Sequence, residues 1–161
     1  MKIVIMGVAG AGKSTLGEAL ARELGTAFLD ADDLHSAENV AWMTSGRPLT
    51  DEMRWPWLDA CGAAMNEHHA VVLGCSALKR AYRDRLRATV PDLRLVYPHA
   101  TKALIEKRVA ERKGHFMPTQ LIDSQFSTLE EPALDENPVI VPATLPVADA
   151  VKLASSMLRA K

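Results

Sequence analysis

The chain has 161 residues, a hydrophobic content of 48% and a formal net charge of -1 at pH 7. This length fits one domain, and the apolar content is enough for a packed core and too high for a disordered chain. The near-neutral charge excludes recruitment of nucleic acid or an anionic membrane by the overall field of the protein, and no apolar stretch is long enough to span a bilayer. We therefore expect neither nucleic acid nor a membrane as a partner.

The first predicted strand, 3–6, leads into the octapeptide Gly-Val-Ala-Gly-Ala-Gly-Lys-Ser at 7–14 and then into a predicted helix at 13–24. This order of strand, glycine loop and helix is typical of the phosphate-binding P-loop. Glycines bring backbone N–H groups close to an anion, and the helix N-terminus adds a partial positive charge. We expect Lys13 to reach the β- and γ-phosphates and the Ser14 hydroxyl to bind Mg²⁺. The residues expected to bind ATP here are Gly7, Val8, Ala9, Gly10, Ala11, Gly12, Lys13, Ser14 and Thr15.

A short predicted strand, 27–29, delivers the acidic sequence Asp-Ala-Asp-Asp at 30–33. In open α/β sheets this C-terminal edge is where ligands bind. Asp30 and Asp32 are two residues apart at a strand end, so their side chains point the same way. One carboxylate can hold Mg²⁺ through water and the other can face an acceptor hydroxyl; the alternative is a turn or helix cap made by acids.

Beyond residue 34 the predicted helices and strands alternate. Thr50 is a good N-cap for the helix that follows it, and Pro56 inside that helix predicts a kink or a later start. Alternation of strands with helices indicates one α/β domain over 1–161, with a five-stranded parallel sheet, helices on both faces and sites along the C-terminal edge. In chain order we expect helices 35–44 and 51–65, strand 70–73, helix 78–89, strand 93–97, helices 102–113 and 120–129, strand 139–141 and helix 147–160.

The two cysteines, Cys61 and Cys75, are too few for a disulfide framework or a zinc site. Cys75 follows an apolar run and is interpreted as a small buried residue rather than a nucleophile. The N-terminus runs straight into a strand and leaves no room for a signal peptide. These features favour a reducing cytoplasm as the location.

A lid is predicted at 112–120. Arg108 and Arg112 are four residues apart and share a helix face, and Gly114 gives the chain after them freedom to move. Phosphoryl transfer depends on positioning and charge neutralisation, so arginines on a closing lid are an expected part of a kinase. The alternative is a solvated basic helix end stabilised by the helix dipole.

A P-loop by itself does not separate GTPases, motors and small-molecule kinases. The chain lacks an Asn-Lys-x-Asp motif that would read guanine, and it is short for a motor. No apolar strand ends in an aspartate of Walker B type, since strand 70–73 is followed by Gly-Cys-Ser. A small kinase with a closing lid fits these observations best.

The chain resembles the bacterial-type gluconokinases, small P-loop kinases related to shikimate kinase and the nucleoside monophosphate kinases. The resemblance covers nearly the whole chain, and the blocks 30–58 and 75–87 are far more specific than the P-loop. The segments that carry it are 7–14, 28–35 followed by Asn39 and Met43, 45–51, 54–58, 75–87, 112–116 and 125–132.

This resemblance implies a P-loop kinase fold and ATP-dependent phosphorylation of D-gluconate at its terminal hydroxyl, with ATP and Mg²⁺ as cofactors, commonly in a homodimer. The hypothesis for the site has Lys13, Asp32 and Arg112 as catalytic residues, Ser14 on Mg²⁺ and Asp30 behind a metal-bound water. Arg108 and Arg112 join the P-loop in binding ATP, and Lys113 closes over the phosphates with them. The residues expected to bind gluconate are Asp32, His35, Arg54, Ser76, Lys79, Arg83 and His115.

Departures from the family pattern lie at its edges. Ser36 and Ala37 replace a more usual proline and basic residue, and the segment 142–145 lacks polar side chains, so contacts to adenine there would come from the backbone. Two alternatives stay open. One is a kinase for another small acid, such as shikimate, or for a nucleotide; the other is a module that senses ATP without transferring phosphate, against which the paired aspartates and the arginines of the lid both argue.

Overall fold

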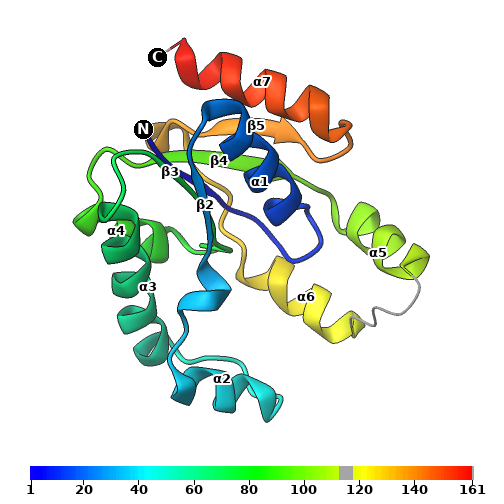
Figure 1. The fold of residues 1–161 in the computed structure, drawn as a ribbon. Helices are drawn as coiled ribbons and strands as arrows, with labels where there is room; N and C mark the ends of the chain where they lie inside the picture. The colour runs from blue at the N-terminus through cyan, green and yellow to red at the C-terminus, as the bar shows by residue number, and fades with distance from the viewer. Residues whose placement is uncertain (113–117, 161) are drawn as a thin grey trace.

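The computed structural model describes residues 1–112 and 118–160, and its centre is a parallel sheet with the strand order β2-β3-β1-β4-β5 (Figure 1). Val4 in the central strand lies opposite Leu73 on one side and Leu95 on the other. The expected five-stranded parallel sheet is thereby confirmed. The strands are β1 (Lys2–Ile5), β2 (Ala27–Asp30), β3 (Val71–Gly74), β4 (Arg94–His99) and β5 (Val139–Pro142).

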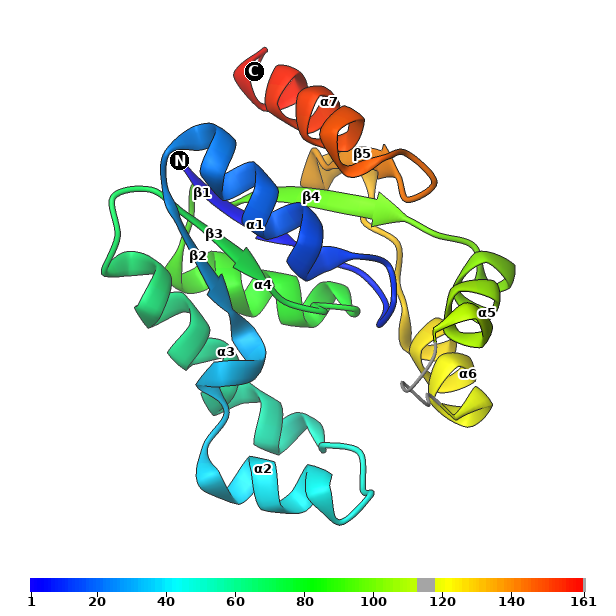
Figure 2. The same ribbon diagram turned by 45° about the vertical axis from the view of Figure 1, so that its right-hand side comes forward.

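Helices cover both faces of this sheet, because its central strands are apolar on both sides. Val4 and Leu73 pack into a core with α3 and α4, whereas Ile5 and Val72 pack into a second core with α1 and α7. Figure 2 shows α2 projecting below the sheet, with the α5–α6 pair at the right of the molecule. The helices are α1 (Lys13–Leu24), α2 (Ala37–Thr44), α3 (Asp51–Asn66), α4 (Arg80–Thr89), α5 (Lys102–Glu111), α6 (Thr119–Thr128) and α7 (Val147–Arg159), with 3-10 turns η1 (Ala31–Leu34) and η2 (Leu134–Glu136).

Helix α1 packs unusually close to β2. A Cβ atom at Gly17 would lie 2.5 Å from a ring carbon of Phe28. Glycine at this helical position therefore sets the distance between the P-loop helix and the strand that carries Asp30. None of the helices in 1–112 and 118–160 combines the length and the apolar character needed to cross a membrane.

Pro56 does not delay helix α3, which runs without a break from Asp51 to Asn66. The proline is exposed, and the carbonyl that its missing N–H would have bonded belongs to Glu52, which is exposed as well. Water can therefore satisfy that carbonyl. At the start of the helix the Thr50 hydroxyl accepts from the Met53 N–H at 3.3 Å, as the sequence predicts.

Two helices start later than expected for local backbone reasons. Helix α4 begins at Arg80, because Ala77 adopts a positive φ of 41° and Lys79 is extended. Helix α2 begins at Ala37, because the acids after β2 form the 3-10 turn η1 and leave His35 extended. Both late helix starts follow strands at the C-terminal edge of the sheet, where the candidate site is found.

Candidate active site

The C-terminal ends of β1, β2 and β3 bring three segments together: the P-loop, the acids after β2 and the loop at 74–79. Two cavities of about 380 Å³ each lie on either side of the P-loop. We call them the acidic cavity and the β5 cavity. The acidic cavity is lined by Ala9, Gly10, Gly12, Lys13, Ser14, Thr15, Asp30, Asp32, Gly74, Cys75, Ser76, Arg112 and Gln125.

The P-loop has the backbone geometry that its glycines predict. Gly10 and Gly12 have φ values of 87° and 89°, in the region that L-residues avoid. Gly12 is the N-cap of α1, and its carbonyl accepts from the Leu16 N–H at 2.9 Å. Gly7 donates its N–H to the Ser76 carbonyl at 3.1 Å, which ties the P-loop to the loop after β3.

Lys13 curls back over the loop, and its Nζ donates to the Val8 carbonyl at 3.0 Å. Burial lowers the pKa of Lys13, and the nearby Cys75, Asp32 and Asp30 oppose that shift. The ammonium group therefore lies in a poorly hydrated position between the loop backbone and two carboxylates. A bound polyphosphate would favour its charged form.

Asp30 and Asp32 have different surroundings although they line the same cavity. Asp30 Oδ1 accepts from the Asp32 N–H at 2.9 Å, so Asp30 is the N-cap of η1. The alternative interpretation of the acids as a turn cap thus holds for one oxygen of Asp30. The Asp32 side chain is exposed to the cavity and makes no hydrogen bond within the described residues.

The acidic cavity offers oxygen donors of the kind that Mg²⁺ prefers. Ser14 and the two carboxylates line it, and Mg²⁺ in kinases takes one or two protein oxygens, with water and phosphate oxygens completing its shell. Within 1–112 and 118–160 no group of three His, Cys, Asp or Glu side chains forms a complete metal cage. The donor set therefore fits a magnesium ion that arrives with a polyphosphate.

The β5 cavity lies between the P-loop and the chain around β5. Arg108 spans it, with one nitrogen donating to Gly10 O at 3.3 Å and another to Ala143 O. Arg112, the C-cap residue that follows α5, has extended backbone and lines both cavities, so Arg108 and Arg112 meet at the β5 cavity although Arg112 lies outside the helix that the spacing predicts. The cavity is lined by Gly10, Ala11, Gly12, Thr15, Leu16, Pro98, Arg108, Glu111, Arg112, Val141, Pro142, Ala143, Leu145, Val147 and Ala150.

Arg54 belongs to a three-membered cluster that the sequence did not reveal. Its NH1 donates to Tyr82 Oη at 3.0 Å and to Asp51 Oδ1 at 3.2 Å, and the Tyr82 hydroxyl donates to the same Asp51 oxygen at 2.6 Å. Burial, followed by the bond to Asp51, raises the pKa of Tyr82 to about 12. The hydrogen bond from Tyr82 is in turn the main reason that the pKa of Asp51 is lowered.

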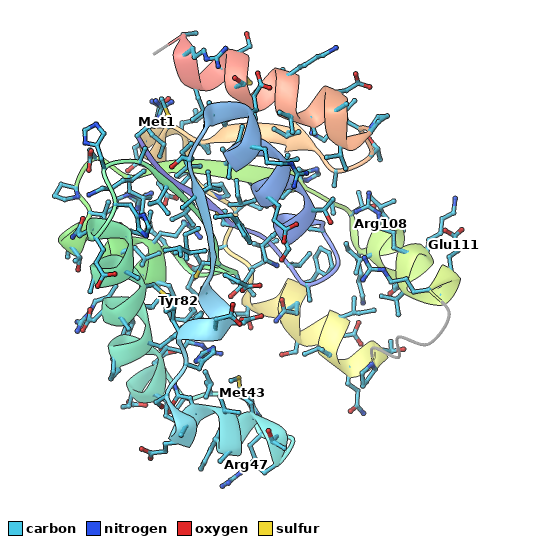
Figure 3. The ribbon with its side chains drawn as sticks, viewed as in Figure 1. Met1, Met43, Arg47, Tyr82, Arg108 and Glu111 are labelled. Carbon is cyan, nitrogen blue, oxygen red and sulfur yellow. The ribbon has the colours of Figure 1, made fainter. Side chains whose placement is uncertain are left out.

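Figure 3 shows Tyr82 and Arg108 on opposite sides of the P-loop. The Lys79 Nζ lies 5.8 Å from the centre of the Tyr82 ring, and the guanidinium carbon of Arg54 lies 5.2 Å from it. Lys79 and Arg54 near Tyr82 therefore lie on one side of the P-loop, and Arg108 of α5 lies on the other.

His35 rests on Trp57, with ring centres 4.3 Å apart and an angle of 13° between the planes. The Trp57 indole donates to Ala31 O at 2.7 Å, so Trp57 is a core residue that also supports the histidine. Asn39 Nδ2 donates to Met53 O at 3.2 Å and lies 3.3 Å from His35 Nδ1. Because that nitrogen can only donate, His35 Nδ1 accepts, and the neutral ring carries its proton on Nε2.

The electrostatic surroundings of His35 favour this neutral form. Burial lowers the pKa of His35, the charge of Arg54 lowers it further, and Asp32 acts in the opposite direction. Of the residues predicted to bind substrate, Asp32 and Ser76 line the acidic cavity itself.

Arg83 corrects one sequence prediction. Its side chain is 0% exposed, and its Nε and NH2 donate to the two oxygens of Glu136 at 2.7 and 3.0 Å. Its NH1 donates to the carbonyls of Ala77 and Leu78 at 2.9 and 3.1 Å. A guanidinium with these partners has no free face for a substrate, so the prediction of direct binding was wrong; Arg83 holds the loop that carries Ser76 and Lys79.

Two further predictions have different outcomes. His115, together with Lys113 and most of the predicted lid at 112–120, lies outside the described residues. Cys75 is buried, as predicted, yet it lines the acidic cavity. A hydrogen bond to Cys75, followed by burial, raises the pKa of Cys61, so Cys61 is a neutral thiol.

The sequence analysis did not predict the residues that hold other site residues in position. Tyr82 and Asp51 hold Arg54, Asn39 fixes His35, and Gln125 reaches the P-loop from α6. Tyr82, Asn39 and Gln125 stand in the blocks that resemble gluconokinases, and that placement was the available signal. Their roles depend on tertiary contacts, which spacing along the chain does not show.

Comparisons with known proteins point to one family. A family model described as an AAA domain matches residues 3–132. The thermoresistant gluconokinase of Escherichia coli K12 is 45% identical over 142 residues, which cover 86% of this chain and 81% of that protein. The gluconokinase of Gluconobacter oxydans 621H is 44% identical over 142 residues, covering 86% of this chain and 79% of the relative.

Solved structures agree with this result. A gluconokinase from Sinorhizobium meliloti 1021 superposes with a TM-score of 0.91 at 44% identity, covering 99% of this chain and 91% of that one. Shikimate kinase from Bacteroides thetaiotaomicron superposes with a TM-score of 0.69 at 19% identity over 99% of this chain and 98% of that one. The second likeness concerns the fold alone.

Proposed function

Because this chain belongs to the gluconokinases and to the family of the matching AAA domain, we propose that it transfers the γ-phosphoryl group of ATP to the terminal hydroxyl of D-gluconate. The products are ADP and 6-phospho-D-gluconate. The observation that carries this function is the acidic cavity, which is lined by the P-loop residues Lys13 and Ser14 together with the carboxylate of Asp32. A single domain, 1–161, supplies all of these groups.

ATP would lie across the P-loop with its base in the β5 cavity and its phosphates over the loop. The walls formed by Val141, Pro142 and Leu145 suit a flat apolar base, and polar recognition would come from backbone groups. The amides from Gly10 to Ser14 and the ammonium of Lys13 would hold the phosphates. Arg108 borders the base cavity, and Arg112 borders both cavities, where it can reach the phosphates.

Mg²⁺ would be held by the Ser14 hydroxyl and, through water, by Asp30, the pair whose oxygen chemistry fits it. When bound there, the ion would supply positive charge that offsets the negative charge of the phosphates. One oxygen of Asp30 accepts the hydrogen bond that caps η1, and this bond fixes the direction of the carboxylate.

Asp32 would accept a hydrogen bond from the gluconate hydroxyl and aim its oxygen in line at the γ-phosphorus. The new O–P bond forms as the bond from the γ-phosphorus to the bridging oxygen breaks, and the hydroxyl proton passes to Asp32. In a loose transition state this aim matters more than early removal of the proton. The exposed, unbonded carboxylate of Asp32 is suited to the task.

Arg54 would bind the gluconate carboxylate. Its NH1 is occupied by Asp51 and Tyr82, whereas its Nε and NH2 make no hydrogen bond within the described part of the chain. An anchored guanidinium with free donors is prepared for an anion, because little freedom remains to be lost on binding. Lys79, Ser76 and the Nε2–H of His35 would add donors for the carboxylate and hydroxyls.

We also propose a cytoplasmic homodimer, following the resemblance of the sequence to its family. Analytical ultracentrifugation of the purified protein should give twice the mass of one chain. A monomer at micromolar concentrations would contradict the dimer and leave the catalytic proposal intact, because both cavities are formed within one chain.

A coupled assay for ADP release tests the reaction directly. Purified protein with ATP and Mg²⁺ is offered gluconate, related aldonates, shikimate and AMP as separate acceptors. We expect gluconate to give the highest kcat/KM, with shikimate and AMP at background. Fast turnover of AMP or shikimate with none of gluconate would replace the proposal with a kinase for another acceptor, and ATP binding without turnover of any acceptor would favour a nucleotide sensor.

A further inference from the structure

Gln125 on α6 contacts the P-loop, and the proposed reaction assigns it no role. The N–H of Ala9, inside the P-loop, donates to Gln125 Oε1 at 3.0 Å, across 116 positions of sequence. Gln125 also lines the acidic cavity together with Lys13 and Asp32. A neutral side chain from a distant helix therefore reaches the point where the loop faces the acceptor.

The chemistry of the bond fixes how the carboxamide is oriented. A backbone N–H can only donate, so the atom of Gln125 that faces Ala9 must be its oxygen. The amide nitrogen Nε2, with two N–H donors, then occupies the other end of the group. Nε2 has no hydrogen-bond partner within 1–112 and 118–160. It is also not one of the buried atoms without a partner, so its N–H groups are accessible from the cavity.

Apolar packing holds Gln125 in this position. Ile122 and Phe126 on the same helix, and Leu129 directly after it, join a cluster with Val8 and Ala11 of the P-loop. Positions 122, 125 and 126 are neighbours on one side of α6, so the contacts that fix α6 against the loop also fix Gln125. The carboxamide is thus carried by a packed element and not by a free surface side chain.

We propose that Gln125 is a further phosphate-contacting residue, whose Oε1 keeps hold of the Ala9 N–H while Nε2 donates to the phosphoryl group in transfer. This inference rests on the proposed function, because it assigns a donor to the same transfer. Negative charge on the phosphoryl oxygens spreads in the transition state, so a fixed neutral donor in the cavity stabilises it more than the ground state.

Two substitutions separate the two ends of the carboxamide. Gln125→Glu has the same shape and can still accept from Ala9, but it replaces the donor with a negatively charged oxygen. Gln125→Met is similar in length and removes both ends without adding charge. Gln120, exposed on the same helix, provides matched controls in Gln120→Glu and Gln120→Met.

We expect Gln125→Met to lower kcat about tenfold, the effect of losing one ordinary hydrogen bond, and Gln125→Glu to lower it at least a hundredfold through repulsion of the phosphates. The gluconate KM should change less than threefold in both, and both Gln120 variants should stay within twofold of the wild type. Values of kcat within twofold of wild type for both Gln125 variants would overturn the inference, as would equal losses in the two.

Hydrogen exchange of the Ala9 amide, followed by NMR, gives a readout that does not depend on turnover. Exchange should be slow in wild type and in Gln125→Glu, and at least tenfold faster in Gln125→Met. Rapid exchange in wild type would overturn the contact even if a variant failed to fold. If wild type does not phosphorylate gluconate, the proposed function fails, and this comparison still tests the bond between Gln125 and the loop.

Discussion

The two halves of the candidate site are built in different ways. The phosphate half, residues 7–15, is one continuous segment that offers backbone N–H groups and Lys13. The acceptor half, with Asp32, His35 and Arg54, consists of separate side chains, and further residues hold His35 and Arg54 in place. Backbone geometry thus prepares one half for phosphate, whereas the other depends on supporting contacts that a single substitution can remove.

The buried pair of Arg83 and Glu136 should be the most sensitive of these supports. We expect Arg83→Met to reduce the free energy of unfolding by about 3 kcal/mol, because the buried Glu136 carboxylate loses the guanidinium that bonds both of its oxygens and keeps only Arg87 and the Ala133 N–H. It also frees the carbonyls of Ala77 and Leu78, so the gluconate KM should rise while the ATP KM stays unchanged. Urea unfolding and steady-state kinetics measure the two effects.

Arg85 on the same helix is the matched control for Arg83. Its two-bond pair with Asp59, at 2.7 Å, lies on the surface with both side chains more than 40% exposed. Arg85→Met should therefore cost less than about 1 kcal/mol. If Arg83→Met and Arg85→Met lowered the free energy of unfolding equally, the buried pair Arg83–Glu136 would stabilise the protein no more than the exposed pair Arg85–Asp59.

Lys13→Ala tests the phosphate half. We expect kcat to fall by about 10²–10³, as for other preorganised electrostatic groups, with the unfolding temperature nearly unchanged. The small effect on stability follows from the burial of Lys13, whose charge is poorly hydrated and gains little in the absence of ATP. Kinetics and thermal unfolding check this, with Glu18→Ala on the exposed face of α1 as control. A large drop in unfolding temperature would mean that Lys13 is a structural residue.

The difference between the two halves of the site explains which features could be predicted from the sequence. The P-loop was predictable because its function lies in consecutive residues, and the fold and family predictions are confirmed by the sheet and by the relatives. The role of Arg83 was not, because Glu136 lies 53 positions away and the positive φ of Ala77 has no glycine to mark it. The assignments of individual site residues stay predictions until they are measured.

Asp32→Asn asks whether the acceptor half takes part in the chemistry or only binds. The amide keeps the shape of the carboxylate but accepts a proton poorly, so we expect kcat to fall about a hundredfold with little change in the gluconate KM. Steady-state kinetics with varied gluconate separates the two constants. A change in KM alone would reduce Asp32 to a binding residue.

Acid should weaken one support of the acceptor half, the Glu136 carboxylate. Burial tends to raise the pKa of Glu136, but bonds from Arg83 and Arg87 overcome it and lower the pKa from 4.5 to about 2. Because the folded-state pKa is lowered, the stabilisation is complete above pH 4.5 and is lost as the pH falls toward 2. Over that window we expect a loss on the order of 2 kcal/mol, measured by urea unfolding. Glu136→Gln should be less stable at pH 7 and should flatten this part of the profile.

Tyr82→Phe should have the smallest effect, because it removes one hydroxyl and leaves the ring in place. That hydroxyl holds both Arg54 and Asp51, so its loss frees the guanidinium without removing it. We expect the gluconate KM to rise about fivefold, the cost of about 1 kcal/mol of lost positioning, with kcat and the ATP KM unchanged. Tyr97 supplies the control, since its hydroxyl bonds to Glu131 and Tyr97→Phe should leave the kinetics of gluconate as they are. If both variants behave alike, the anchoring of Arg54 contributes nothing, and the acceptor half would be as self-sufficient as the P-loop.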